Sequence, residues 1–201
     1  MATGKIPVTV ISGFLGAGKT TLVNHLLSQN TQYRIGVVVN EFGEVGIDGE
    51  LIVSEQQALI EINNGCVCCT VRADLVASVK QMLTLAGDRL DRLIVETSGL
   101  ADPAPVLQTF LADPDLRSQV ELESVITVID ALHLQGQLGD EIVREQIAFA
   151  DTLIVNKVDL IGADTLADIS AQVRLINRTA ALLPARHSQI AVDVLLGTRR
   201  F

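Results

Sequence analysis

The chain has 201 residues, of which 48% are hydrophobic and 19% charged, and these proportions exclude a disordered chain and fit one α/β domain. Its formal net charge of −9 argues against a nucleic-acid partner, because a sequence-independent contact with phosphates needs positive charge. No apolar run reaches the roughly 18 residues of a membrane span, and the N-terminus lacks the apolar region of a signal peptide. We therefore expect a single cytoplasmic domain over residues 1–201, with neither a nucleic-acid nor a membrane partner.

The first predicted element is an apolar strand at 6–11, which leads into a glycine-rich motif. Residues 13–20 read GFLGAGKT and fit G-x-x-x-x-G-K-[ST], the phosphate-binding P-loop. Apolar residues at helical spacing follow, which completes the strand–loop–helix setting that the motif requires. In this setting the loop N–H groups face an anion, and we expect Lys19 to reach the β- and γ-phosphates and the Thr20 hydroxyl to ligate Mg²⁺. The other predicted nucleotide-binding residues of the loop are Gly13, Gly16, Ala17, Gly18 and Thr21.

A second apolar strand is predicted at 35–40, and near-continuous apolar strands that alternate with helices indicate a parallel sheet. We therefore predict an α/β fold of three layers, in which helices flank a mostly parallel central sheet. The next segment, 41–50, contains three glycines and four acidic residues and has no helical period. In a P-loop protein such a segment is typical of a switch that senses the γ-phosphate. A solvated acidic loop is the alternative interpretation.

All three cysteines, Cys66, Cys68 and Cys69, lie within four positions. An Asn-Asn-Gly turn precedes them, and a helix is predicted to begin behind them at Thr70. A helix N-terminus favours thiolates, and three soft ligands in so short a span favour a thiophilic ion such as Zn²⁺. A closed zinc site needs a fourth ligand, which Glu44, another side chain, water or a partner would supply. The alternatives are a redox pair or small buried side chains.

Another apolar strand ends in Glu96, and Gly99 follows three positions later. At the carboxyl end of a parallel strand, Glu96 would face the Mg²⁺ ion and the attacking water, and the Gly99 N–H would approach the γ-phosphate. The alternative interpretation of Glu96 is a strand-end acid that faces solvent. Asp102 and Pro103 predict the start of the next helix, with Asp102 as its N-cap.

A later apolar strand runs into the sequence Asn156-Lys157-Val158-Asp159, more than 130 residues beyond the P-loop. A carboxylate at Asp159 can accept hydrogen bonds from both the N1–H and the 2-amino group of guanine, whereas adenine lacks both donors. We therefore expect Asp159 to select GTP. Asn156 is expected to tie this loop to the P-loop, and the stem of Lys157 is expected to lie along the base.

The three histidines have less specific settings. His25 lies in the first helix, where a surface or packing role is expected, and His133 follows a strand in a predicted loop. His187 lies in a loop after the last strand that could contact the base or a metal. The remaining predicted elements are strands at 59–62, 93–96, 125–130, 153–155 and 180–183, helices at 141–150 and 165–177, and a short helix that starts at 193.

Together these motifs resemble the CobW-type GTPases, metal-chaperone relatives of the nickel-insertion GTPases for urease and hydrogenase. The resemblance covers nearly the whole chain and rests on GFLGAGKTT at 13–21, NEFGE at 40–44, NGCVCC at 64–69, ETSG at 96–99 with ADP at 101–103, and NKVD at 156–159. It implies a P-loop fold, binding of GTP and GDP with Mg²⁺, low GTPase turnover, and Zn²⁺ or Co²⁺ at the Cys-x-Cys-Cys. It also implies a metalloprotein or cofactor-synthesis client and is compatible with a homodimer.

The chain departs from the family pattern at two points. Some relatives carry an acid, linked to metal, immediately before the NEFGE motif, and this chain has Val39 there, so we expect no extra metal site at that position. Family members usually continue into a second, often histidine-bearing domain, whereas this sequence ends at Phe201. We expect either a natural single-domain form or an excised GTPase domain.

The sequence thus predicts a GTP switch that is linked to a metal. Closure of the 41–44 and 96–99 loops around the γ-phosphate would change the geometry of the cysteines, which lie between them in sequence. Metal and nucleotide affinities would then be coupled by about 1–3 kcal/mol. By position, the candidate catalytic residues are Lys19, Glu41 and Glu96. The alternatives are a P-loop ATPase or small-molecule kinase with a structural zinc site, and a zinc storage module with a vestigial nucleotide site.

Overall fold

The computed structural model describes residues 4–41, 52–53, 57–63, 70–86 and 89–197. Its strands form one sheet in the order β3-β4-β2-β5-β1-β6-β7-β8, and every described pairing is parallel except that of β3 with β4. The strands are β1 (Ile6–Ser12), β2 (Ile35–Glu41), β3 (Ile52–Val53), β4 (Gln57–Asn63), β5 (Arg92–Glu96), β6 (Val120–Asp130), β7 (Thr152–Asn156) and β8 (Ala181–Pro184). The helices are α1 (Lys19–Gln29), α2 (Thr70–Ala86), α3 (Pro103–Ala112), α4 (Pro114–Gln119), α5 (Leu134–Gln137), α6 (Glu141–Ala148), the 3-10 helix η2 (Val158–Leu160), α7 (Ala163–Ile176) and α8 (Val192–Leu195). None of these described helices is both long enough and apolar enough to cross a membrane.

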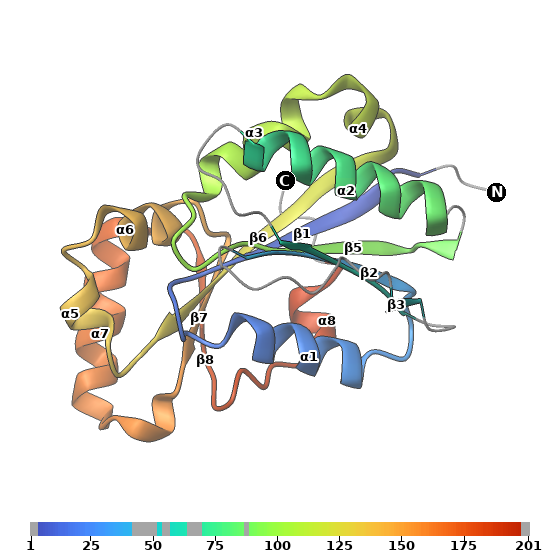
Figure 1. Ribbon diagram of the computed structural model, residues 1–201. Helices are drawn as coiled ribbons and strands as arrows, with labels where there is room; N and C mark the ends of the chain where they lie inside the picture. Colours follow the sequence, from blue (N-terminus) through green and yellow to red (C-terminus); the bar gives the residue numbers. More distant parts are fainter. Residues whose placement is uncertain (1–3, 42–51, 54–56, 64–69, 87–88, 198–201) are drawn as a thin grey trace.

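Successive strand residues point to opposite faces of the sheet, and each face has its own apolar layer. On one face, α2 and α3 pack on Val8, Val10 and Val95, and α6 and α7 pack on β6 and β7. On the opposite face, α1 and α8 pack on Ile11 and Ile94. Figure 1 shows α2, α3 and α4 above the sheet and α1 and α8 below it. The predicted three-layer fold with a mostly parallel central sheet is therefore confirmed.

Strand β6 is longer than predicted, because it begins at Val120 and not at 125. Its first half carries Glu121 and Glu123, which interrupt the apolar run from which the strand was predicted. Glu123 is nevertheless buried, because it pairs with Arg92 at the start of β5. Smaller corrections apply at other boundaries: β4 extends to Gln57–Asn63, α6 ends at Ala148, α7 begins at Ala163, and β8 spans Ala181–Pro184.

Helix α4 was not predicted, although its N-terminus repeats the Ala-Asp-Pro sequence that correctly predicted α3. At α3, Asp102 Oδ1 accepts a hydrogen bond from Ala104 N at 2.8 Å. At α4, Asp113 Oδ1 accepts from Leu116 N at 3.0 Å, and Pro114 occupies the first turn, where its missing N–H costs no helical bond. The short elements β3 and α5 were also not predicted.

The carboxyl ends of the parallel strands meet at one edge of the sheet. Glu96, which ends β5, pairs in register with Ile11 of β1 and with Val39 of β2, and Asp130 of β6 pairs with Asn156 of β7. The segments that follow β1, β5, β6 and β7 therefore leave the sheet at the same edge. In open α/β sheets this is the edge at which ligands bind.

Candidate functional site

The P-loop connects β1 to α1 and depends on glycine at its last turn. Gly18 is the N-cap of α1 and has a φ of 108°. Residues that carry a Cβ atom rarely adopt this backbone conformation. A Cβ atom there would also lie 2.5 Å from Asn156 Nδ2 and 2.8 Å from Ser188 Oγ. Only glycine therefore lets two later segments of the chain approach the loop this closely.

Lys19 is the first residue of α1, and its side chain lies over the loop that precedes it. The residue is only 8% exposed, and its Nζ donates a hydrogen bond to Phe14 O at 3.2 Å. The ammonium group is thus held at the P-loop next to the helix N-terminus, where backbone N–H groups and the helix dipole favour an anion. This is the position that the sequence motif predicts for a lysine that binds phosphate.

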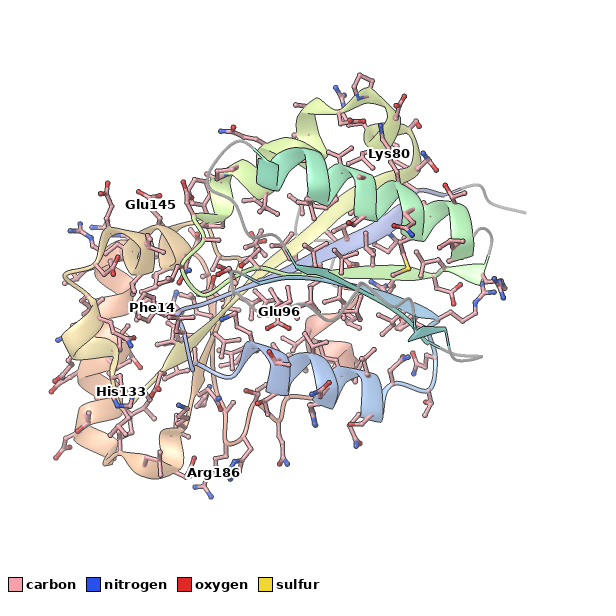
Figure 2. The ribbon with its side chains drawn as sticks, in the orientation of Figure 1. Phe14, Lys80, Glu96, His133, Glu145 and Arg186 are labelled. Carbon is pink, nitrogen blue, oxygen red and sulfur yellow. The ribbon has the colours of Figure 1, made fainter. Side chains whose placement is uncertain are left out.

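The structure brings together Thr20 and Glu96, the two residues predicted to ligate Mg²⁺. Thr20 Oγ1 donates a hydrogen bond to Glu96 Oε1 at 2.7 Å, although the residues lie 76 positions apart. Glu96 is 4% exposed, so the alternative in which this acid faces solvent is wrong. In Figure 2, Glu96 lies between the sheet and α1, the helix that contains Thr20. A hydroxyl and a carboxylate held together in this way are oxygen ligands of the kind that Mg²⁺ prefers.

Gly99 lies in the loop after β5, and this loop packs directly against the P-loop. A Cβ atom on Gly99 would lie 2.7 Å from Leu15 N and 2.9 Å from Leu15 Cα. On the other side, Gln146 Nε2 of α6 donates to Gly99 O at 3.2 Å and to Ala101 O at 3.1 Å. Gln146 is 1% exposed and was missed from the sequence. Its position on the same helical face as Val143 and Ile147 could have indicated a buried polar residue.

The motif at 156–159 is joined to the P-loop through Asn156. Its Nδ2 donates to Ala17 O at 2.9 Å, which is the predicted tie between the two motifs. Its Oδ1 accepts a hydrogen bond from Ser188 N at 2.8 Å, and Ser188 Oγ in turn donates to Gly18 O at 3.0 Å. Ser188 is fully buried and was not predicted, whereas its exposed neighbour His187 was considered. One side chain therefore holds three separate loops together.

Lys157 and Asp159 follow Asn156 directly. Lys157 has a φ of 63° and is the N-cap of η2, the 3-10 turn that contains the exposed Asp159. Lys157 Nζ donates to Asp130 Oδ2 at 2.7 Å, and His133 Nδ1 lies 2.9 Å from the same oxygen. Burial opposes ionisation of Asp130, but the hydrogen bonds from Lys157 and His133 outweigh it, so the pKa of this carboxyl lies below its usual value. Asp130 was not predicted as a site residue.

This geometry can be compared with known proteins. Residues 7–184 match the family model described as CobW/HypB/UreG, nucleotide-binding domain. The chain belongs to this family. The match includes the P-loop, the motif at 156–159 and all of the described strands except the first residue of β1, and it confirms the family resemblance inferred from the sequence motifs.

Individual relatives in the CobW/HypB/UreG family are similar over almost the whole chain. The chain is 36% identical to the zinc chaperone CobW of Sinorhizobium sp and 36% identical to the zinc chaperone YjiA of Escherichia coli. These alignments cover 96% and 98% of this chain but 63% and 62% of those relatives. The crystal structure of the Zn(II)-bound YjiA GTPase from E. coli has a TM-score of 0.75 and 31% identity, over 98% of this chain and 63% of that chain. The chain thus spans less than two thirds of the length of these relatives.

The residues predicted to bind the transition metal, Cys66, Cys68, Cys69 and Glu44, lie outside the described residues. In the part of the chain that the structure describes, no three His, Cys, Asp or Glu residues are grouped so that they could hold a metal ion. Glu41 is the last residue of β2 and pairs in register with Asn63, the last residue of β4. The strands that precede the 41–50 and 64–69 segments therefore end side by side, at the same edge of the sheet as the P-loop.

The histidines of this family member have different environments. His25 Nε2 lies 3.0 Å from Ile190 O, a contact expected for a packing residue. His133 follows β6, as predicted, and its side chain is exposed apart from its contact with Asp130. His187 is exposed and has a φ of 51°, and no described contact assigns it to the base or a metal.

Proposed function

We propose that this domain binds GTP and GDP with Mg²⁺, hydrolyses GTP slowly, and passes Zn²⁺ or Co²⁺ held at Cys66, Cys68 and Cys69 to a metalloprotein or cofactor-synthesis client. The relatives described as zinc chaperones and as a Zn(II)-bound GTPase support the proposal. The nucleotide half of it rests chiefly on the hydrogen bond from Asn156 Nδ2 to Ala17 O at 2.9 Å. This bond joins the P-loop to the motif that we propose recognises guanine.

Each described residue would have a definite role towards the phosphates. The N–H groups of the P-loop, from Gly13 to Thr21, would face the phosphate oxygens, and Lys19 would neutralise charge on the β- and γ-phosphates. Thr20 and Glu96, already in contact at 2.7 Å, would hold Mg²⁺, which when bound would stabilise charge on the phosphate oxygens. Glu96 and Glu41 are the candidates to orient the attacking water.

The base would be selected by Asp159. Its carboxylate would accept the N1–H and 2-amino hydrogen bonds of guanine, and Asn156 would keep the motif at a fixed distance from the phosphate site. An adenine nucleotide would leave the carboxylate without these donors, and a site built for a hydrogen bond discriminates strongly against a ligand that lacks it. A carboxylate at Asp159 therefore favours a GTPase over the rival P-loop ATPase or small-molecule kinase.

The proposed coupling between metal and nucleotide is supported by the positions of the strand ends next to the cysteine segment. Asn63 and Thr70 flank the cysteine segment, and Asn63 pairs in register with Glu41, from which the proposed switch segment leads. If bound GTP pulls the 41–44 segment towards the γ-phosphate, it would therefore move the segment that follows β2, and β2 is the strand paired with the one that precedes the cysteines. We propose that GTP and the metal change each other's affinity by about 5–150-fold, the usual range for coupled sites.

The first experiment tests nucleotide identity. A fluorescent GDP analogue is displaced from the full chain by GDP and by ADP, with the wild type and with Asp159→Asn. We expect GDP to compete far better than ADP in the wild type, and we expect the variant to lose most of that preference. Equal competition by ADP in the wild type, or a preference that Asp159→Asn leaves unchanged, would favour the ATPase or kinase.

The second experiment tests coupling to the metal. The Zn²⁺ affinity of the full chain is measured by chelator competition with a non-hydrolysable GTP analogue and with GDP. We expect the two affinities to differ. Lys19→Ala, the matched control, keeps the thiols and loses the nucleotide response, and the Cys66/Cys68/Cys69→Ala variant loses the zinc. Equal zinc affinities with the two nucleotides would refute coupling while leaving the GTPase assignment intact.

A further inference from the structure

Asp130 occupies a position beside the base-recognition motif that no sequence motif marks. It is the last residue of β6, pairs in register with Asn156, and is 4% exposed. Its Oδ2 accepts from Lys157 Nζ at 2.7 Å and contacts His133 Nδ1 at 2.9 Å, while its Oδ1 accepts from Leu132 N at 2.9 Å. A buried carboxylate with this many donors has a fixed orientation.

Lys157, which Asp130 holds, has an unusual backbone conformation. Its φ of 63° lies in the left-handed region, which costs free energy for a residue other than glycine and persists only where the surroundings impose it. On one side, Asn156 is tied to Ala17 and Ser188, and on the other side Val158 N donates to Ala185 O at 3.2 Å. These contacts hold the backbone before and after Lys157, and Asp130 holds the side chain.

The turn that begins at Lys157 is the turn that contains Asp159. We propose that Asp130 is a positioning residue for guanine recognition, which acts through Lys157 to fix the turn that presents Asp159 to the base. The inference rests on the proposed binding of guanine nucleotides. The alternative is a purely structural role, in which Asp130 is a buried ion-pair partner that affects only the stability of the fold.

The same strand contains a control for this alternative. Glu123, near the start of β6, is also 4% exposed and also forms a buried ion pair, with Arg92. It lies near the opposite end of the strand from the nucleotide loops. If loss of a buried carboxylate were sufficient to disturb nucleotide binding, Glu123→Gln and Asp130→Asn would have the same effect.

The test compares GDP with inosine diphosphate, which lacks only the 2-amino group that Asp159 is proposed to accept. Dissociation constants are measured by competition on the full chain for the wild type, Asp130→Asn and Glu123→Gln. We expect the wild type to prefer GDP and Asp130→Asn to lose about tenfold of that preference, because hydrogen bonds to a charged group depend strongly on alignment. Glu123→Gln is expected to lower stability and to keep the wild-type preference.

A second variant shows whether the effect passes through the lysine. Lys157→Met is measured alone and combined with Asp130→Asn, and the double variant is expected to have the same GDP preference as Lys157→Met alone. If Asp130→Asn does not fold, Lys157→Met still breaks the link from the other side and is expected to show the same loss of preference.

Two results would overturn the inference while leaving the proposed function in place. The first is that Asp130→Asn or Lys157→Met keeps the wild-type preference for GDP over inosine diphosphate. The second is that Asp130→Asn has its full effect in the Lys157→Met background. A wild type that binds ADP as well as GDP would instead overturn the proposed function itself, and the inference with it.

Discussion

The two ends of β6 contain the same kind of group in two different settings. Near the amino end, Glu123 pairs with Arg92, whose side chain is 11% exposed and whose guanidinium lies 4.3 Å from the centre of the Tyr33 ring. At the carboxyl end, Asp130 pairs with Lys157, whose side chain is 31% exposed and whose backbone is left-handed. The first pair is enclosed by regular structure, whereas the second supports a loop.

The difference shows where this fold places stability and where it places recognition. An enclosed ion pair is expensive to break, because the partner left behind keeps its charge without compensation. A pair that holds a loop contributes less to the core but determines the position of atoms that meet a ligand. The amino edge should therefore affect unfolding, and the carboxyl edge should affect nucleotide binding and hydrolysis.

The largest expected effect is on stability, at the amino edge. Glu123→Gln leaves the Arg92 guanidinium buried beside a neutral amide, and we expect the free energy of unfolding to fall by about 3–5 kcal/mol. GTP hydrolysis by the folded variant should stay within about twofold of the wild type, since the substitution is distant from the site. Urea denaturation and a hydrolysis assay measure the two effects, and Glu121→Gln, an exposed neighbour, is the control. A loss no larger than that of the control would remove the contrast between the two ends.

The next effect is on hydrolysis, at the carboxyl edge. Lys19→Ala removes the ammonium group held at the P-loop, and we expect the GTP hydrolysis rate to fall by about 100- to 1000-fold, as for the loss of one essential charge-stabilising donor. Lys80→Ala is the control, because Lys80 lies on the outer side of α2 and pairs with Asp113 and Asp115. Steady-state phosphate release measures both. A Lys19→Ala protein with wild-type turnover would contradict the assignment of the site.

A third substitution acts on both properties at once. Gln146→Met has a similar volume but no donor, so the Gly99 and Ala101 carbonyl groups lose their buried partner, and we expect a stability loss of about 1–3 kcal/mol. Because the loop after β5 is then less firmly held against the P-loop, turnover should fall several-fold while GDP affinity changes little. Arg144→Met, on the exposed side of the same helix, is the control for both measurements. Unchanged turnover would mean that this bond has no role beyond packing.

The sequence was sufficient to predict the layers of the fold and the residues of the two nucleotide motifs. Apolar runs marked β1, β2, β5 and β7, and the motifs marked Thr20, Glu96 and Asn156, because each motif specifies chemistry within one short loop. The start of β6 was missed for a physical reason. Glu123 interrupts the apolar run as a charged residue, but in the fold its charge is balanced by Arg92 of β5. The hydrophobic pattern of one segment does not reveal a partner on another strand.

The supporting residues of the site could not be predicted for a similar reason. Ser188, Asp130 and Gln146 each contact a motif residue or its loop across a long sequence separation, through packing of elements that only the register of the sheet brings together. Their own neighbours in sequence contain no motif. The cysteine segment is the opposite case, because its chemistry was predicted from spacing alone and it lies outside the described residues.

The smallest expected effect is a dependence of the Asp130 contribution on pH. The pKa of Asp130 lies below its usual value despite burial, because Lys157 and His133 donate hydrogen bonds to the ionised form. A carboxyl group whose pKa is lowered by folding stabilises the protein above its unfolded pKa, about 3.9, and loses that contribution as the pH falls through the lower folded value. We therefore expect the difference in unfolding free energy between the wild type and Asp130→Asn to shrink as the pH falls below about 4. Other carboxyl groups with lowered pKa values, such as Asp91 and Asp113, are present in both proteins and cancel in the difference. Urea denaturation at a series of pH values below about 5 measures this difference. A difference that grows as the pH falls below about 4 would show that folding stabilises the protonated form of Asp130.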